Sequence, residues 1–277
     1  MRPAKICLFL FLIFMFSAGV HAAPADEKAS QKASSPEENA KTRNLKTGVG
    51  RVSTTEHVLE VNGEKLAYTA QAGEMIVDLD NNGKKARFFF IAYKKNGRKQ
   101  NERPITFAFN GGPGAAAVWL HLGGLGPRIL DLDETGTPLP PPVQMIPNPL
   151  TWLRFTDMVF IDPVGTGYSR SITGKEKQFF NLQEDVRSVA EFIRLYLSIE
   201  DRWLSPKFLT GESYGTTRAA ALSEYLDRSL GIRLNGIVLI SPVLDFATIT
   251  FDGSLNLPYS LFLPSYAAAK KFHEQGL

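Results

Sequence analysis

Cysteine is almost absent from this chain: the only one among its 277 residues is Cys7, close to the N-terminus. A single cysteine cannot form an intramolecular disulfide, so the fold cannot depend on a disulfide framework. The sequence also contains no Asn-x-Ser/Thr site for N-glycosylation. For an exported protein, both absences favour a bacterial periplasm or medium over a eukaryotic secretory route.

The chain has no strong excess of charge of either sign. Lys and Arg total 31 and Asp and Glu total 28, which gives a net charge of +3, and the charged residues are scattered. Nucleic-acid binding usually needs a basic patch or stripe, so the sequence predicts no nucleic-acid partner. The length and the 44% apolar content suit one sizeable domain with a large core.

Hydrophobic runs long enough to span a membrane are also missing from the N-terminal region. The apolar run from Ile6 to Phe16 is well short of the roughly twenty residues that cross a bilayer, so an uncleaved anchor is disfavoured. Arg2 and Lys5 precede the run and Val20-His21-Ala22 follows it, which is typical of a secretory signal peptide cleaved after Ala22. A lipoprotein anchor would need a cysteine at that point. We therefore expect residues 1–22 to be a signal peptide and the mature protein to be periplasmic or secreted, without stable membrane association.

Composition changes again after the predicted signal peptide. Residues 23–47 are rich in Ala, Lys, Glu, Ser and Pro without apolar periodicity, which predicts a disordered linker before a domain over residues 48–277. The domain begins with β-rich runs at residues 55–61, 65–71, 74–79 and 87–93. The turn sequences near them, Asn62-Gly63, Asn81-Asn82-Gly83 and Asn96-Gly97, favour hairpins. We expect an antiparallel meander that leads into a first parallel strand at Ile105.

Strand-like and helix-like runs alternate in the later part of the domain. Residues 158–161, 208–209 and 236–240 resemble strands, whereas residues 182–199 and 216–230 have helical periodicity. This rhythm implies a parallel sheet with helices on both faces. The predicted fold class is α/β, an incomplete α/β-hydrolase fold. It comprises the meander and the first part of the parallel sheet, and ends where a lid insertion begins, at residues 251–275.

Gly211-Glu212-Ser213-Tyr214-Gly215 lies where a strand-like run changes to a helix-like one. In a nucleophile elbow a serine occupies such a turn, and flanking glycines are needed because a Cβ would collide with neighbouring backbone. The serine hydroxyl then lies beside free N–H groups at the start of a helix. The alternative is a Ser N-cap after a tight turn, because Ser is among the best N-cap residues.

Two other glycine-rich segments also follow strand-like runs. Asn110-Gly111-Gly112-Pro113-Gly114 follows residues 105–109, and Asp162-Pro163-Val164-Gly165-Thr166-Gly167-Tyr168-Ser169 follows residues 158–161. Glycines at the end of a strand let backbone N–H groups point into open space, as an oxyanion hole requires. Each segment taken singly could also be an ordinary turn.

In this order the three segments resemble the signatures of the serine carboxypeptidase family, peptidase family S10, in its bacterial form, over roughly residues 50–277. The resemblance implies a serine-type carboxypeptidase that acts on peptides with a free C-terminus through an acyl-enzyme, without metal or organic cofactor. By the same resemblance the catalytic nucleophile is Ser213 and the oxyanion hole is formed by Gly112 and Tyr214. The residues that bind the carboxylate of the substrate are Asn110, Gly111 and Glu212.

Glu212 has a second interpretation, as an exposed acid at a helix start, where negative charge is favourable. If it does bind a carboxylate it must carry a proton, since like charges in contact cannot both ionise. We therefore expect release of C-terminal residues to be best at acidic pH and to weaken as Glu212 ionises.

The chain departs from the family pattern at three positions. Gly124 stands where the family often has a second Glu, Ala108 where Trp is usual, and Ala115 where a Cys is usual. The change at Ala115 only removes a disulfide, whereas Gly124 puts recognition of a free carboxylate in question. An esterase or acyltransferase on the same scaffold is therefore the alternative enzyme.

The sequence lacks a catalytic acid and base at the expected places. In the hydrolase fold the order is Ser, acid, His, with the last two on loops after later strands. The candidates that follow the serine are Asp227, Asp245, Asp252 and His273. His273 lies in a helical run with no strand before it, whereas His57 and His121 precede the serine and are expected on a strand surface and in packing. We therefore expect a chain truncated before its catalytic Asp and His, and a non-catalytic fragment is the remaining alternative.

Overall fold

The computed structural model describes residues 48–80, 83–97, 99–133, 136–137, 139–251 and 253–274. The predicted signal peptide and linker, residues 1–47, lie outside these ranges, so both remain predictions. Within the described ranges, no helix is both long and apolar enough to cross a membrane.

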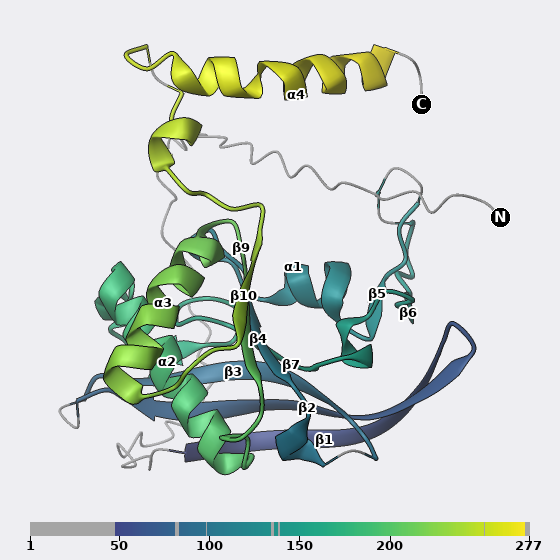
Figure 1. Cartoon of the computed structure of the whole chain (residues 1–277), viewed down its shortest axis with the longest axis vertical. Coiled ribbons are helices and arrows are strands. Elements are labelled where there is room, and N and C mark those ends of the chain that lie inside the picture. The colour runs from purple at the N-terminus through teal and green to yellow at the C-terminus, as the bar shows by residue number, and fades with distance from the viewer. Residues whose placement is uncertain are drawn as a thin grey trace, which may run out of the picture. The chain divides into compact units, whose positions relative to one another are not determined.

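An eight-stranded mixed sheet forms the centre of the domain (Figure 1). Its strands are β1 (Gly48–Val61), β2 (Glu64–Asp78), β3 (Lys85–Lys95), β4 (Ile105–Phe109), β7 (Asp157–Ile161), β8 (Arg170–Ser171), β9 (Lys207–Glu212) and β10 (Gly236–Ile240). Seven of them follow the order β1-β2-β3-β7-β4-β9-β10, and β8 pairs with β3. A separate hairpin is made by β5 (Arg128–Leu130) and β6 (Met145–Pro147).

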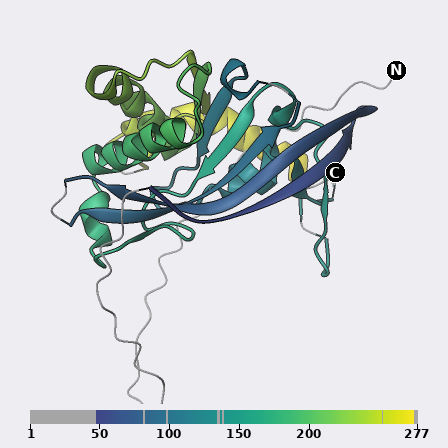
Figure 2. The same ribbon diagram turned by 90° about the horizontal axis from the view of Figure 1, so that it is seen from below.

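The predicted meander is confirmed, because β1, β2 and β3 pair in antiparallel fashion (Figure 2). Asn62 and Gly63 have φ angles of 52° and 78°, the left-handed values that a tight two-residue hairpin turn needs. The prediction of separate strands at residues 65–71 and 74–79 was wrong, because residues 65–78 belong to the continuous strand β2. Gly73 lets the strand continue past the point where the register of β1 shifts. A Cβ at Gly73 would lie 2.6 Å from Val52 Cγ2, so only a glycine fits there.

The strands predicted to be parallel are confirmed. β4 is parallel to both β7 and β9, and β9 is parallel to β10. Every residue of β4 and β7 is buried, as expected of central strands covered on both faces. Since parallel strands end at the same edge, the segments that follow β4, β7 and β9 all emerge together at the carboxyl edge, where α/β sheets bind ligands.

The two long helices of the parallel part cover one face of the sheet. α2 (Leu182–Ile199) and α3 (Tyr214–Leu230) bury Phe192, Tyr196 and Leu222 in one cluster with Phe88 and Phe107. The crossovers from β7 through α2 to β9, and from β9 through α3 to β10, both progress toward the β10 edge. Right-handed crossovers that progress in one direction place their helices on the same face.

Among the described residues, the opposite face carries only short helices. The connection from β4 to β7 runs back the other way and contains α1 (Val118–Leu120) and the π-helix η2 (His121–Leu125), whose Leu120 and Leu125 pack on Ala108 and Phe160. The prediction of helices on both faces therefore holds only in this limited form. The described ranges also contain the 3₁₀ turns η1 (Gln100–Glu102), η3 (Trp152–Arg154), η4 (Glu176–Phe179) and η5 (Phe246–Ile249).

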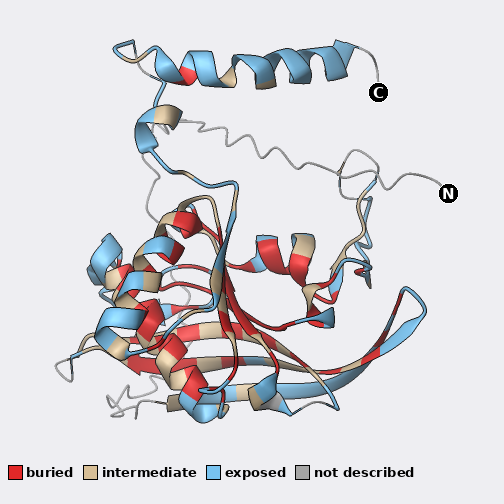
Figure 3. Cartoon of the chain, in the orientation of Figure 1, coloured by how far each residue is buried: buried red, intermediate tan, exposed pale blue. Residues whose placement is uncertain are grey.

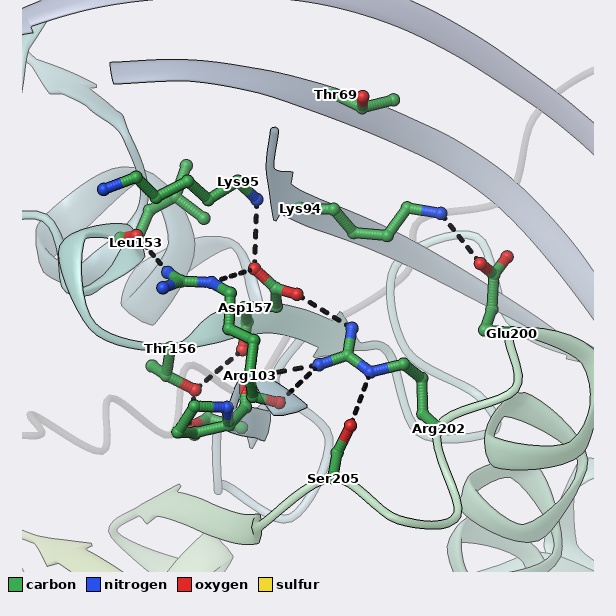
Figure 4. A network of polar contacts seen from close by, with 12 residues as sticks. Thr69, Lys94, Lys95, Arg103, Leu153, Thr156, Asp157, Glu200, Arg202 and Ser205 are labelled. Carbon is green, nitrogen blue, oxygen red and sulfur yellow. Dashed lines mark hydrogen bonds and ion pairs between the residues drawn. The ribbon is translucent and has the colours of Figure 1, made fainter. Parts of the chain in front are cut away.

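A buried ion-pair network ties together the opposite, amino-terminal ends of the parallel strands (Figure 4). Asp157, the first residue of β7, accepts from Arg103 Nε at 2.7 Å and from Arg202 Nη1 at 2.8 Å. Arg202 is fully buried and also donates to the Arg103 carbonyl at 2.8 Å and to Ser205 Oγ at 2.7 Å. Because every charge has a partner, the network can be accommodated in the interior.

The last described elements are largely exposed. Residues 237–239 of β10 are 36–39% exposed, although the strand pairs with β9. Helix α4 (Leu257–Glu274) lies in the region predicted to begin a lid and is almost entirely pale blue in Figure 3. Pro258 is its only residue classed as buried. The helical run predicted around His273 is confirmed.

Candidate active site

Ser213 occupies a strained turn between β9 and α3. Its φ and ψ are 56° and −122°, a conformation that L-residues rarely adopt and that functional sites retain. The flanking glycines are required: a Cβ at Gly211 would lie 2.1 Å from the Gly215 carbonyl oxygen, and one at Gly215 would lie 3.0 Å from that of Phe109. The elbow geometry predicted from the sequence is therefore present.

The capping alternative for Ser213 is wrong. The residue stands at the N-cap position of α3, but its side chain makes no capping hydrogen bond. Its backbone carbonyl instead accepts from the backbone N–H and the hydroxyl of Thr216, at 2.9 and 2.7 Å. The serine hydroxyl therefore does not serve to stabilise the start of the helix.

The loop after β4 packs directly on the elbow. Phe109 pairs with Gly211 in the sheet, so the segments that follow β4 and β9 start side by side. A Cβ at Gly111 would lie 2.5 Å from the backbone N of Tyr214, and Gly112 has φ +104°. Both positions thus need glycine, one for close approach and one for its backbone conformation. Within the described part of the chain, the N–H groups of Gly112 and Tyr214 donate to no other residue.

Asn110 and Glu212 are brought together by the same register. Asn110 Nδ2 donates to Glu212 Oε2 at 3.1 Å, and Asn110 Oδ1 accepts from the Leu120 N–H at 3.0 Å. The second bond sets which end of the amide faces the glutamate. Asn110 is 2% exposed and Glu212 is half-buried, so the description of Glu212 as an exposed helix-start acid was wrong. The pair presents one donor amide and one carboxyl group at the carboxyl edge.

The segment after β7 supports this edge through Asp162. Its carboxylate accepts from the N–H groups of Ala117 at 2.9 Å and Tyr168 at 3.4 Å. Burial raises the pKa of Asp162, and these two hydrogen bonds and Arg170 act in the opposite direction. Asp162 therefore joins its own loop to the residues just before α1.

The three positions that depart from the family pattern differ in their surroundings. Gly124 lies in η2, where a Cβ would meet nothing within 4 Å, and its carbonyl accepts from Asn148 Nδ2 at 2.7 Å. Ala108 is fully buried between its sheet partners Phe160 and Thr210. Ala115 is half-buried in the loop after β4.

The two described histidines that precede the serine, His57 and His121, occupy the environments predicted for them. His57 lies on the exposed surface of β1, where Nε2 contacts Thr55 Oγ1 at 2.7 Å and the ring stacks on Tyr68. His121 is 6% exposed, and burial lowers its pKa to about 4. Its Nε2 is engaged with the Tyr93 hydroxyl at 2.6 Å. Neither imidazole is hydrogen-bonded to Ser213.

The described acids and the histidine that follow the serine lie in other surroundings. Asp227 pairs with Arg233 at 3.3 Å on the surface, and Asp245 caps η5 by accepting from the Ala247 N–H at 2.9 Å. His273 is exposed on α4 against Phe272. Asp252 lies outside the described residues. In the described ranges, no three His, Cys, Asp or Glu side chains gather as metal ligands.

Two residues of this region were missed by the sequence analysis. Arg218 of α3 and Asp185 of α2 form a buried ion pair at 2.8 Å behind the elbow. Burial raises the pKa of Asp185, an effect that Arg218 and the Tyr214 hydroxyl oppose. Helical spacing could have indicated them: Asp185 and Arg218 each precede an inward apolar residue, Val189 and Leu222, by four positions.

A family model described as serine carboxypeptidase matches residues 64–258. The chain belongs to the serine carboxypeptidase family. One similar protein is serine carboxypeptidase-like 51 of Arabidopsis thaliana, 31% identical over 168 residues, which are 56% of this chain and 33% of that protein. Another is a carboxypeptidase Y homolog of Arthroderma benhamiae, 29% identical over 174 residues, which are 61% of this chain and 32% of that protein. The chain thus spans about a third of the length of these relatives.

One solved structure has a similar fold. It is the crystal structure of a prohormone-processing carboxypeptidase from Saccharomyces cerevisiae, with a TM-score of 0.50 and 23% identity, over 64% of this chain and 40% of that one. The likeness concerns the fold alone. Together with the mixed sheet and its parallel strands, it confirms the predicted α/β-hydrolase fold in partial form.

Proposed function

We propose that this serine carboxypeptidase family member hydrolyses peptides through an acyl-enzyme on Ser213. The observation that carries the proposal is the strained φ of 56° at Ser213, between two glycines that neighbouring backbone requires. Such strain persists where surrounding structure maintains it for function. Attack of Oγ on the scissile carbonyl forms the C–O bond of a tetrahedral intermediate, and the hydroxyl proton passes to the general base. The base returns this proton to the departing amine as the C–N bond breaks, which leaves the acyl-enzyme, and water then hydrolyses the ester.

The N–H groups of Gly112 and Tyr214 form the oxyanion hole in this proposal. Their support is that Tyr214 directly follows the serine, that Gly111 beside Gly112 packs on the backbone of Tyr214, and that neither N–H donates to another described residue. Two donors fixed before the reaction stabilise the developing negative charge without reorganisation, and loss of one donor typically costs roughly a hundredfold or more in rate.

The Asn110–Glu212 pair and the Gly111 N–H bind the C-terminal carboxylate of the substrate in this proposal. The hydrogen bond of 3.1 Å between Asn110 and Glu212 supports it, because it places an amide donor beside a carboxyl group at the substrate edge. A protonated Glu212 would donate to the incoming carboxylate, whereas an ionised one would repel it. Peptide hydrolysis should therefore be favoured at acidic pH.

The general base and its acid partner belong, in this proposal, to a longer polypeptide. His57 and His121 have other partners, and the relatives are about three times as long as the matched segment. Removal of the base from a triad costs on the order of a millionfold in kcat. Residues 1–22 provide the export signal in the same proposal, and the protein acts in the periplasm or outside the cell.

The test compares hydrolysis of an N-blocked dipeptide by the longer wild-type polypeptide, which carries the base in this proposal, and by its Ser213→Ala variant at acidic and neutral pH. We expect hydrolysis by the wild type alone, with the higher kcat/KM at acidic pH. Hydrolysis that persists in the alanine variant would contradict the nucleophile. A folded wild-type protein that hydrolyses no substrate would favour the non-catalytic alternative.

An esterase or acyltransferase is the second candidate, favoured by Gly124 and Ala108 in place of the family's Glu and Trp. The C-terminal amide and ester of the same dipeptide distinguish the two functions. A carboxypeptidase should prefer the free carboxylate, whereas an esterase should be indifferent to it.

A further inference from the structure

Arg218 is a buried cation that contacts both segments of the proposed site. It lies on α3, four residues after Tyr214, and is 2% exposed. Its Nη1 donates to the backbone carbonyl of Asn110 at 2.8 Å, and its Nε donates to Asp185 Oδ2 at 2.8 Å. The guanidinium carbon lies 5.3 Å from the centre of the Phe109 ring and 5.2 Å from that of the Tyr214 ring. One side chain thus connects the end of β4, the elbow and α2.

The bond to the Asn110 carbonyl sets the direction of the next amide. In a trans peptide the C=O and the following N–H point in opposite directions. Because Arg218 holds this carbonyl toward α3, the N–H of Gly111 points away from α3. That N–H is one of the donors proposed for the substrate carboxylate, and Gly111 itself packs on the backbone of Tyr214.

Asp185 completes the arrangement on the other side of the guanidinium. Its Oδ2 accepts from Arg218 and also from the Tyr214 hydroxyl, at 3.3 Å. The ring of Tyr214 therefore contacts Arg218 and hydrogen-bonds to its counter-ion, while its backbone N–H is the proposed oxyanion donor. Since a buried ion pair by itself is a poor source of stability, its position between two catalytic segments points to another role.

We propose that Arg218, held by Asp185, is a positioning residue that aligns the Gly111 and Tyr214 N–H groups with Ser213. The inference rests on the proposed function, because these donors belong to that site. Arg218 acts only through the two backbone segments that it connects. Misplacement of reacting groups by about 1 Å can cost roughly a hundredfold in rate, so the expected effect is large.

A matched pair of lysine variants tests the inference. Arg218→Lys keeps the charge but loses the planar fork that reaches two acceptors at once. Arg202→Lys is the control, because Arg202 is also fully buried and also bridges an aspartate and a backbone carbonyl (Figure 4). It does so at the amino-terminal ends of the strands. Both variants should lower stability, and only Arg218→Lys should alter the site.

Two readouts are measured on the longer polypeptide that carries the base in the proposed function, and both are expressed per folded molecule. The first is kcat/KM for an N-blocked dipeptide and for its C-terminal ester. We expect Arg218→Lys to lower the dipeptide value by about a hundredfold, and the ester value less, because the ester has no carboxylate for Gly111. Arg202→Lys should stay within about twofold. The second readout is the amide chemical shift and hydrogen exchange of Gly111, Gly112 and Tyr214, which should change in Arg218→Lys alone.

The outcomes separate the inference from the proposed function. Equal effects of the two lysine variants on both readouts, or no effect of either, would mean that Arg218 is only structural. If the wild type hydrolyses neither substrate but Arg218→Lys selectively shifts the three amides, the proposed function is wrong and the positioning role stands. If Arg218→Lys does not fold, Asp185→Asn replaces it, with the same selective amide shifts expected and their absence overturning the inference.

Discussion

His121 Nε2 and the Tyr93 hydroxyl lie 2.6 Å apart in a buried aromatic cluster, and the His121 ring centre is 4.7 Å from that of Phe160. This environment lowers the pKa of His121 to about 4, because burial disfavours the charged imidazolium. The proposed reaction is favoured at acidic pH, whereas the fold is more stable at a pH where His121 is uncharged. Acidic pH therefore favours the reaction and weakens the fold.

The first prediction concerns stability at acidic pH. An unfolded histidine has a pKa near 6.5, so below that pH the unfolded chain binds a proton that the folded chain excludes. This histidine therefore leaves the free energy of unfolding at its full value above about pH 6.5. As the pH falls toward 4, the free energy of unfolding decreases by about 3 kcal/mol in total. His121→Gln, which cannot titrate, should unfold in urea with a smaller loss between about pH 7 and pH 4.5. His57→Gln, on the surface, is the control, and equal pH dependence of all three proteins would contradict the prediction.

The second prediction concerns Gly124. A side chain there would extend into open space, whereas a Cβ at Gly126 would lie 2.6 Å from the His121 carbonyl oxygen. Gly124→Ala should therefore leave the thermal midpoint nearly unchanged, and Gly126→Ala should lower it.

Gly124→Glu restores the family's glutamate and should lower KM for a free-carboxylate dipeptide at acidic pH by about tenfold, without a matching change for the ester. A uniform change for both substrates would argue against carboxylate recognition.

The third prediction concerns Gly167. A Cβ there would lie 1.9 Å from Asp162 Oδ2, and the residue has φ +46°. Gly174 has φ +70° with nothing within 4 Å, so an alanine there meets only backbone strain. Gly167→Ala should be more destabilising than Gly174→Ala by about 2 kcal/mol, since it also displaces a hydrogen-bonded carboxylate. Urea unfolding measures both, and equal losses would show that the Asp162 contacts contribute little.

The fourth prediction concerns the ion-pair network at the other end of the strands. Asp157→Asn leaves two buried guanidinium groups, Arg103 and Arg202, without a counter-ion and should cost about 3–5 kcal/mol. Asp227→Asn breaks an exposed pair with Arg233 and should cost less than about 1 kcal/mol. Urea unfolding of both variants checks the contrast. Because the network lies far along the strands from Ser213, kcat/KM per folded molecule should be unchanged in both.

Local signals in the sequence were sufficient for much of the fold. The apolar run at residues 105–109, the Asn62-Gly63 turn and the elbow around Ser213 each depend on a few adjacent residues, and the structure contains all three. The prediction of separate strands at residues 65–71 and 74–79 was wrong, because Gly73 between them makes a close contact with Val52 inside one continuous strand. A glycine by itself does not reveal which neighbour its missing Cβ makes room for.

The sequence by itself determined the order of strands, helices and glycine-rich turns, because periodicity and backbone freedom are local properties. Only the tertiary structure decided that Asn110 meets Glu212 and that Arg218 holds the Asn110 carbonyl, 108 residues away in the chain. It also decided that α2 and α3 share one face, since this follows from the direction in which successive strands are added. Such contacts depend on sheet register and crossover handedness, and neither is encoded in any single segment.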